Sequence, residues 1–595
     1  MPHGGGPAIV RVRPTHAQTT PMRSLALRLP ALSLLVALAA PESATTQSVR
    51  QAGRSQDGMV STAHPLATDA GVRMLELGGN AADAAVAAGF AIAVVEPSMN
   101  SIGGRNQILV RTPDGAFHGI DGTTQAPWDY DPETAPQAAY GYAVIGIPGA
   151  LAGLMKLHDE HGTLPRAAVM APAIEYAERG FRVLPGEAAR QASAADEALE
   201  FPGTAAAYYK LDGSPYRPGE LLVQPDYAST LRKIVQGGRE AFYEGEVARA
   251  MAADLAANGS TVGLEAIQGY EAEESRIVRG SYRGYELVGL DVPAAGVLAI
   301  EALQIMERFD ADSMSEPEWF AVTAQALRIA SRELRGLGTD TAAARATSKE
   351  WAARMAQEIA APGRAPTVPG GEAGSAAGSV VAGSQRAGPH AEGPRTAPEA
   401  QPDLHGHTTH LSTADADGMV VSLTQTLGPT MGSKVVTPGL GFLYASTLGG
   451  YLSNITAGVR ARSNICPFLV LRDGEVVLVL GAAGGGMIPP AVVHAVTRVI
   501  DFGMSLPEAL AEPRVAGGGG GAFDAETSPD IGWTPDELDA MRALGIEVDP
   551  TPRSGAFGRV HGIQLDPEAR TWIGAADPDW EGSARGPALV GLGGR

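Results

Sequence analysis

A short segment in the second half of the chain gathers side chains that could do chemistry. Gly406-His-Thr-Thr-His-Leu-Ser-Thr413 holds histidines and hydroxyl groups at the start of a predicted strand, directly after a low-complexity stretch. A threonine hydroxyl is a poor nucleophile unless a base lies beside it. An α-amino group on the same residue, with a reference pKa of about 8, would be such a base, but a threonine carries one only at a chain terminus.

A glycine-rich loop is the second candidate element. Gly481-Ala-Ala-Gly-Gly-Gly486 follows the apolar run from Val476 to Leu480 and precedes a helix predicted from Pro490. Backbone N–H groups in such a loop can point into a cavity and stabilise an oxyanion. A phosphate-binding loop is the competing interpretation, but no lysine follows the glycines as that motif requires.

The histidines of the first segment form an H-x-H-x-x-H run, His405, His407 and His410, which could be mistaken for a zinc site. Apart from Asp403 the run contains no carboxylate, and a strand would point alternate side chains to opposite faces. We therefore predict no metal and no cofactor. A metal hydrolase stays as a rival hypothesis, which a chelator would test.

Over roughly residues 58–590 the chain resembles the gamma-glutamyltranspeptidase family. That family carries a Thr-x-His-x-Ser stretch, matched here by Thr408-Thr-His-Leu-Ser412. Other landmarks occur in the same order: Gly78-Gly-Asn-Ala-Ala-Asp83, Gly146-Ile-Pro-Gly-Ala150, His161-Gly-Thr-Leu-Pro165, Phe242-Tyr-Glu-Gly245, Tyr282-Arg-Gly-Tyr285 and Gly432-Ser-Lys-Val435.

The resemblance implies self-cleavage between His407 and Thr408 and a heterodimer cut from one precursor. Thr408 would be the nucleophile, Thr426, eighteen positions later, a helper hydroxyl, and Gly484 and Gly485 the oxyanion hole. The implied fold is α/β, a four-layer αββα sandwich of the N-terminal nucleophile hydrolase type. The implied reaction is hydrolysis or transfer of the acyl group of gamma-glutamyl amides such as glutathione, or of related small-molecule or peptide amides.

The substrate pocket departs from the family. Thr123 stands where the family has an arginine for the α-carboxylate, and Gly428 and Thr447-Leu-Gly-Gly450 replace the groups that hold the α-amine. An ammonium group without partners is disfavoured out of water, so a free glutamyl amine should bind poorly.

Three other residues could contact the substrate. Ser463 and Asn464 replace the family's paired serines and keep hydrogen-bonding groups, and Arg105 stands where a glycine or small residue is usual. Arg105 could bind a substrate carboxylate in place of the family's arginine, whose position Thr123 occupies. Alternatively, it could be a surface arginine in a salt bridge.

The segment between Gly450 and Ser463 is short. It suggests an open cleft, which favours water over an amine as the second substrate and admits larger acyl groups. A non-glutamyl acylase and a binding homologue without catalysis remain as alternatives.

Composition divides the chain into four parts. Residues 1–57 contain a basic start and the apolar run 29–40, typical of a signal peptide and an exported, periplasmic or secreted protein. Residues 58–360 form the predicted large-subunit region, 361–407 a flexible Gly/Ala/Pro-rich tail, and 408–595 the small catalytic subunit. No later run is long and apolar enough for a membrane span.

Charge and cysteine content exclude several functions. A formal charge of −21 over 595 residues argues against a nucleic-acid partner, and the single Cys466 rules out an intramolecular disulfide framework.

Local patterns predict the elements that position the candidate residues. Asn80 should cap a helix over Ala81–Val95, and strands are expected at Tyr285–Leu290, 408–413, 419–426, 468–472 and 475–480. Turn signals between the last four strands predict that the second half begins as a β-meander.

Overall fold

The fold is that of a computed structural model, which describes residues 51–334, 340–359, 408–450, 452, 455–517, 522–527, 532–552, 557–579 and 581–588. The signal-like run at 29–40, the tail at 361–407 and the histidines His405 and His407 lie outside these residues. Among the described helices, none has the length and apolar character needed to cross a bilayer.

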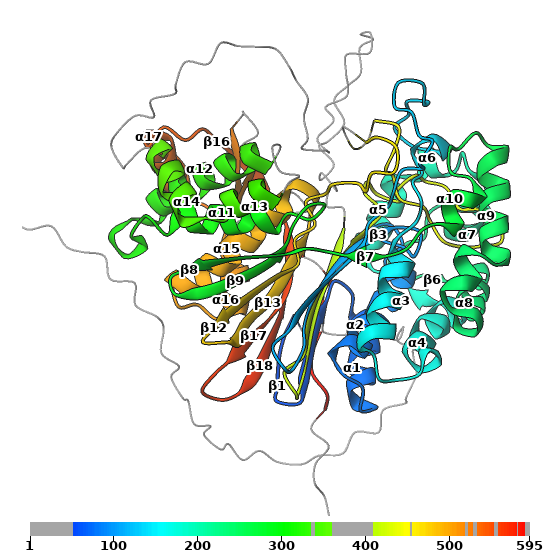
Figure 1. Ribbon diagram of the computed structural model, residues 1–595, viewed down its shortest axis with the longest axis horizontal. Coiled ribbons are helices and arrows are strands. Elements are labelled where there is room, and N and C mark those ends of the chain that lie inside the picture. Colours follow the sequence, from blue (N-terminus) through cyan, green and yellow to red (C-terminus); the bar gives the residue numbers. More distant parts are fainter. Residues whose placement is uncertain are drawn as a thin grey trace, which may run out of the picture. The chain divides into compact units, whose positions relative to one another are not determined.

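Two sheets of seven strands each face one another (Figure 1). In spatial order, sheet A contains β1 (Ala52–Ser55), β18 (Thr571–Ala576), β17 (Arg559–Asp566), β13 (Glu475–Ala483), β12 (Phe468–Arg472), β9 (Tyr285–Leu290) and β8 (Ile277–Tyr282). Sheet B contains β19 (Ser583–Arg585), β2 (Gly58–Thr62), β10 (Thr409–Asp415), β11 (Val420–Thr426), β3 (Arg105–Arg111), β4 (Phe117–Gly122) and β7 (Glu273–Glu274).

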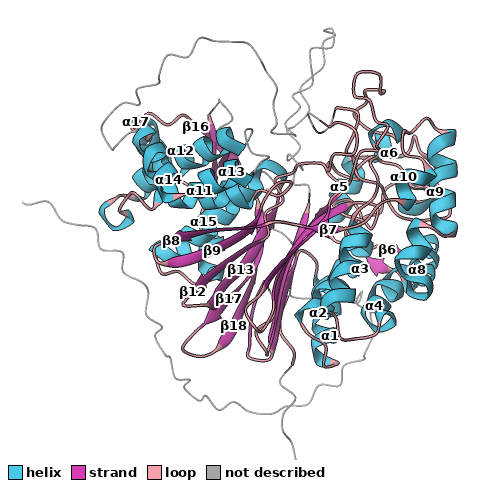
Figure 2. Ribbon diagram, viewed as in Figure 1, coloured by secondary structure: helices cyan, strands magenta, loops and turns pink. Residues whose placement is uncertain are grey.

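Helices cover the outer face of each sheet (Figure 2). On sheet B lie α1 (Pro65–Glu76), α2 (Ala81–Val95) and α3 (Ala150–His161), backed by α4 (Arg166–Arg179), α8 (Pro225–Tyr243), α9 (Glu246–Ala257) and the short α5 (Pro185–Ser193), α6 (Ala195–Ala198), α7 (Pro202–Tyr208) and α10 (Leu264–Gln268). On sheet A lie α11 (Gly296–Met306), α15 (Ile488–Asp501) and α16 (Leu506–Ala511), backed by α12 (Glu316–Leu334), α13 (Asp340–Ala346), α14 (Lys349–Met355) and α17 (Pro535–Ala543). The predicted four-layer αββα sandwich is confirmed.

Two minor sheets complete the described elements: β5 (Phe181–Arg182) with β6 (Leu221–Leu222), and β14 (Val515–Gly517) with β15 (Phe523–Thr527) and β16 (Val548–Pro552).

Helix α2 follows its predicted bounds because its ends are encoded locally. The side chain of Asn80 accepts hydrogen bonds from the amides of Ala82 and Asp83, and Asp83 returns a bond to the Asn80 amide, forming a capping box. Every residue of α2 is buried, since the helix lies between sheet B and α4.

Strand β10 is buried on both faces, and its residues alternate between two environments. Leu411 packs with the helix layer and Thr413 donates to the carbonyl of Ala81 in α2. His410, Ser412 and Ala414 face sheet A. By the same alternation, the residue before the strand, Thr408, belongs to the face between the sheets.

The space between the sheets is apolar at one end and polar at the other. Met59, Leu109, Val288, Leu469 and Val479 belong to the apolar cluster. Toward the other end, serine hydroxyls of sheet B donate to carbonyls of sheet A: Ser61 to Ala575 at 2.7 Å, Ser412 to His561 at 3.0 Å and Ser422 to Leu480 at 2.9 Å. These three hydrogen bonds, here called the serine bridges, fix the two sheets together near the candidate site.

The predicted β-meander is wrong. Strands β10 and β11 pair as a hairpin in sheet B, whereas β12 and β13 pair as a second hairpin in sheet A. The cause is the long connection from Leu427 to Pro467, which crosses from one sheet to the other. Both sheets therefore combine strands from before and after residue 407.

Candidate active site

Thr408, Thr426 and Arg105 lie in one row across three neighbouring strands of sheet B. Thr409 pairs with Gln425, so the same register places Thr408 opposite Thr426. Thr426 in turn pairs directly with Arg105 at the start of β3. Side chains of directly opposed residues project from the same face of a sheet. All three therefore belong to the face between the sheets, at the polar end.

The two threonine hydroxyls are in contact. Thr408 Oγ1 donates to Thr426 Oγ1 at 3.0 Å, and the amide of Gly428 donates to the same Thr426 oxygen at 2.9 Å. Both threonines are buried. An oxygen that accepts from the Thr408 hydroxyl polarises it, so this pair can raise the nucleophilicity of Thr408.

The backbone at Thr408 adopts an unusual conformation, with φ of 99°. A positive φ at a β-branched residue is a real outlier, because the Cβ atom meets the neighbouring backbone. Such a conformation costs about 1–3 kcal/mol and persists only where the surroundings impose it. The peptide bond before Thr408 is therefore next to a strained residue.

The predicted glycine loop stands across the space between the sheets. Strand β13 runs on to Ala483, three residues beyond the predicted end, and Gly484 (φ 129°) and Gly485 (φ 56°) then form the turn into α15. Along the two sheets Ser422 faces Leu480 and His410 faces Gly481, so β13 runs toward the same end of the sandwich as the row before it reaches Gly484.

This turn is suited to hold an anion. A side chain added at Gly485 would meet no atom within 4 Å, so the turn borders open space. Within the described residues, no backbone carbonyl accepts from the amides of Gly484 or Gly485. Both φ values favour glycine, and the N–H groups of such a turn are what an oxyanion hole requires.

His410 is a neutral structural residue between the sheets. Its Nδ1 contacts Thr424 Oγ1 at 2.7 Å and its Nε2 contacts Ser412 Oγ at 3.1 Å. Burial, with the charge of nearby His561 as a smaller cause, holds the pKa of His410 well below its usual value. Within the described ranges, no group of three or more His, Cys, Asp or Glu residues could bind a metal ion.

Arg105 is buried, with 2% of its surface exposed, so the surface salt-bridge alternative does not describe it. Its Nη1 donates to the carbonyl oxygen of Ser446 at 3.3 Å. The hydroxyl of Ser446 is itself buried and has no hydrogen-bond partner among the described residues. A cation and a hydroxyl group thus lie beside Thr426.

Apart from Arg105 and the Asp121 carboxylate, which accepts from the Thr123 amide at 2.8 Å, the side chains of the wall around Thr123 are neutral. The register of β3 and β4, continued by one residue, brings Thr123 beside Arg105, and the hydroxyl of Thr123 accepts from Gln107 at 2.8 Å. Thr447 Oγ1 donates to Thr124 Oγ1 at 2.8 Å. These neighbours are neutral hydroxyl and amide groups.

Sequence reasoning missed Arg460, which reaches this wall from another segment. Its guanidinium donates to the Asp121 carbonyl at 2.8 Å and forms ion pairs with the carboxylates of Asp121 at 3.5 Å and Glu273 at 3.0 Å. It also lies over the ring of Tyr270. Two carboxylates neutralise its charge. No local signal in the sequence identifies this residue.

Ser463 and Asn464 lie at the corresponding end of sheet A. They precede β12, whose first residue, Phe468, pairs with Leu480 close to the end of β13. Both are half-buried, and the Ser463 amide donates to the carbonyl of Pro293 at 2.9 Å. They lie at the same end of the sandwich as the row. Among the described residues, no contact joins them to Thr408.

The sequence matches the model of one protein family, gamma-glutamyltranspeptidase, over residues 67–586. It is 34% identical over 543 residues to the acylase ACY 1 proenzyme of Pseudomonas sp. (strain SE83), covering 87% of this chain and 91% of the relative. It is 28% identical over 568 residues to the glutathione hydrolase proenzyme of Escherichia coli (strain K12), covering 88% and 91%.

A solved structure agrees with the fold. The cephalosporin acylase from Bacillus halodurans superposes with a TM-score of 0.77 at 27% identity, covering 93% of this chain and 100% of that chain. The similarity extends over both sheets and both helix layers, since it spans nearly the whole chain.

Proposed function

The chain belongs to the gamma-glutamyltranspeptidase family of N-terminal nucleophile hydrolases, and from that premise we propose that it is a self-cleaving threonine amidohydrolase acting through an acyl-enzyme. The contact between the hydroxyls of Thr408 and Thr426, 3.0 Å apart, carries this proposal.

The proposed first event is cleavage between His407 and Thr408. The strained φ of Thr408 supports it, because φ no longer constrains the residue once the preceding peptide bond is gone. Cleavage gives a large subunit, 58–407, ending in the segment 361–407, and a small subunit, 408–595. The two form a heterodimer. The proteins named acylase and glutathione hydrolase above are also proenzymes.

In the proposed reaction the free amine of Thr408 accepts the proton of the Thr408 hydroxyl as Oγ1 attacks the amide carbonyl carbon. The carbonyl electron pair moves to its oxygen, which the amides of Gly484 and Gly485 hold. The intermediate collapses, the C–N bond breaks, and the leaving amine takes the proton. Water then attacks the resulting ester, with the same amine as base, and releases the acid.

The proposed substrate is an amide whose acyl group carries a carboxylate but no α-amine, such as a glutaryl amide. Arg105, buried beside Thr426, is proposed to bind that carboxylate, and Ser463 and Asn464 supply further hydrogen-bonding groups. At Thr123, Thr124 and Thr447 an ammonium group would meet neutral hydroxyls, and the nearby Asp121 carboxylate is paired with Arg460. The gamma-glutamyl amides of the family are the second candidate, favoured by the sequence match to that family.

Hydrolysis is proposed to exceed transfer to an amine, since the short segment between Gly450 and Ser463 leaves the site accessible to water. Export to the periplasm or beyond is proposed from the signal-like run at 29–40.

A panel of p-nitroanilides tests the substrate. Glutaryl, succinyl, gamma-glutamyl and neutral acyl anilides are assayed with and without an acceptor dipeptide, and glutaryl should be cleaved faster than gamma-glutamyl with little effect of the dipeptide. A strong gamma-glutamyl preference would contradict the pocket proposal. A chain that remains at full length on a denaturing gel would contradict the enzyme proposal itself.

A further inference from the structure

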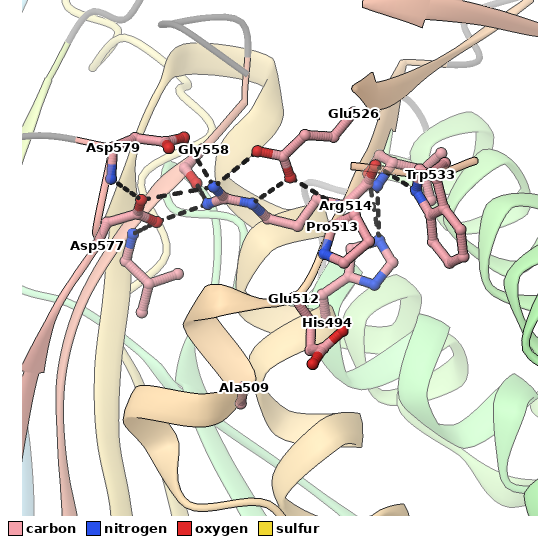
Figure 3. A network of polar contacts seen from close by, with 12 residues as sticks. His494, Ala509, Glu512, Pro513, Arg514, Glu526, Trp533, Gly558, Asp577 and Asp579 are labelled. Atoms are coloured by element: carbon pink, nitrogen blue, oxygen red, sulfur yellow. Dashed lines mark hydrogen bonds and ion pairs between the residues drawn. The ribbon is translucent and has the colours of Figure 1, made fainter. Parts of the chain in front are cut away.

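A buried arginine behind the glycine turn has no role in the reaction described above (Figure 3). Arg514 precedes β14 and is 3% exposed. Its guanidinium contacts carboxylates from two other segments: Nε donates to Glu526 at 3.2 Å, Nη1 to Asp577 at 2.6 Å and Nη2 to Asp579 at 3.0 Å. All five N–H donors of an arginine lie in one plane, which suits such a cluster.

Nη1 of Arg514 also donates to a backbone carbonyl, that of Gly558. Gly558 immediately precedes β17, and Asp577 holds the same end of that strand by accepting from the Val560 amide at 3.3 Å. Arg514 and Asp577, which form an ion pair, therefore both hold the backbone from 558 to 560. The arginine donates to the carbonyl of Gly558 and the aspartate accepts from the amide of Val560.

Gly558 lies directly against the glycine turn. A side-chain carbon added at Gly484 would come within 2.9 Å of the Gly558 Cα atom, and one added at Gly558 would come within 2.4 Å of the Met487 carbonyl oxygen. Real Cβ atoms do not approach other atoms so closely, so both positions need glycine. Any shift of Gly558 must therefore move the turn that contains Gly484 and Gly485.

The cluster keeps Arg514 charged. Burial lowers the pKa of Arg514, but Asp577, Glu526 and Asp579 together outweigh burial and raise it above the usual arginine value. An arginine with this many carboxylates around it forms charge-assisted hydrogen bonds, which are shorter and stronger than neutral ones. Its bond to Gly558 is thus a strong constraint on a flexible residue.

We propose that Arg514 is a positioning residue that holds the oxyanion turn in place through the carbonyl of Gly558. This inference rests on the proposed role of Gly484 and Gly485. The arginine touches neither the substrate nor the reacting atoms. It acts because an oxyanion hole works only when its donors are held, before the reaction, where the charge will develop.

The test compares Arg514→Lys with Gly558→Ala in the processed heterodimer. Lysine keeps the charge but cannot bond Gly558 and both sets of carboxylates together, and alanine at 558 pushes on Met487 while leaving the arginine cluster intact. In each we expect kcat to fall about tenfold or more with KM within about twofold, because the turn acts on the transition state.

A boronic acid bearing the acyl group of the best anilide substrate separates positioning from a loss of folded enzyme. It forms a tetrahedral adduct with a threonine oxygen and mimics the transition state, so its inhibition constant should rise by the factor by which kcat/KM falls. Gly263→Ala is the control, because a side-chain carbon added there would meet no atom within 4 Å, and it should leave both values within about twofold.

Unchanged kcat/KM and boronate affinity in Arg514→Lys and Gly558→Ala would overturn the inference and leave the proposed function standing. If the wild-type protein cleaves no amide, the proposed function fails instead. A higher KM with unchanged kcat in both variants would also overturn the inference, since it would place the effect on substrate binding.

Discussion

Within the row, Thr408 and Thr426 form the proposed catalytic part, called the catalytic row from here on, and Arg105 with Thr123 forms the proposed acyl-binding wall. The two are neighbours in sheet B, yet they differ in how they relate to the family. Thr408 and Thr426 on β10 and β11 match the family's motif, whereas on β3 and β4 an arginine stands at 105 and a threonine at 123. The positive group is thus one strand closer to the nucleophile than the family pattern places it. Neighbouring strands lie about 4.8 Å apart, so reaction chemistry and substrate choice are separated by only one strand spacing.

The two regions differ because they tolerate different amounts of change in residue type and position. A nucleophile and its helper must keep a hydrogen bond, so the row allows little change in residue type or position. A pocket wall needs only a group of suitable charge within reach of the substrate, and a long arginine can supply it from a neighbouring strand. Variants of each region should therefore have different kinds of effect.

Thr408→Ala is the severest break of the catalytic row. It should abolish self-cleavage and reduce amide hydrolysis by at least about a thousandfold, since neither hydroxyl nor terminal amine remains. A denaturing gel and an anilide assay measure both. Thr409→Ala removes the same atoms from the opposite face of the strand and should still be cleaved. A cleaved and active Thr408→Ala protein would refute the assignment of the nucleophile.

Thr426→Val keeps the shape of the helper and removes its hydroxyl. The hydrogen bond from Thr408 is worth about 2–3 kcal/mol to the reacting oxygen, so kcat should fall roughly a hundredfold while KM changes little. Thr426→Ser retains the hydroxyl and should keep most of the activity. Equal rates for the valine and serine variants would mean that the hydroxyl has no part in the reaction.

Arg105→Gln changes the wall and spares the row. Loss of the cation should lower kcat/KM for a glutaryl anilide about tenfold and leave a neutral acyl anilide nearly unchanged, because only the charged acyl group uses the arginine. Arg111→Gln, at the far end of the same strand, is the control and should not alter the preference. A uniform loss on both substrates would show that Arg105 acts on folding or on the row.

The polar region between the sheets also contains two buried histidines, His410 and His561. The effect of acid on these histidines should be the smallest of the effects expected here. Burial lowers the pKa of His561 to about 3, while Asp577 raises it and Arg559 lowers it to smaller extents, and burial lowers the pKa of His410 as well. A lowered histidine pKa gives stability that is complete above the unfolded value of 6.5 and is lost as the pH falls toward 3.

In that window each of these histidines should reduce the free energy of unfolding by up to about 1.4 kcal/mol per pH unit. Urea unfolding at several pH values between 4 and 7 measures the slope, and His561→Gln should make it shallower. A wild-type slope no steeper than that of the variant would mean that His561 does not titrate on unfolding.

Local patterns were enough to predict much of the fold. The capped helix at Ala81–Val95 and the strands at 285–290 and 468–472 follow from side chains close together in the sequence. The assignment of the two hairpins to different sheets could not be predicted, since their pairing depends on partners far away in the chain. The end of β13 was also missed, because Gly481-Ala-Ala483 has the composition of a loop; glycine is needed there to make room for the ring of His410.

The residues of the candidate site also fall into those that the sequence could predict and those that it could not. Motifs in three separate segments, taken with the family resemblance, pointed to Thr408, Thr426 and the glycine pair, and the structure brings the two threonines together. The positions of Arg105 beside Thr426, Arg460 beside Asp121 and Arg514 behind the turn depend on cross-strand register and on long-range contacts. Sequence reasoning could name Arg105 as a candidate from its unusual position, but had no means to find the other two.

Strands from before and after residue 407 alternate within both sheets, and this affects how a cleaved protein could come apart. Strands β10 and β11 lie between β2 and β3, and β12 lies beside β9, so each sheet alternates between the regions before and after residue 407. A cut before Thr408 would leave two pieces that cannot part without opening both sheets. The cleaved protein should therefore stay together as long as both sheets stay folded, and its resistance to dissociation would be set by the rate of unfolding.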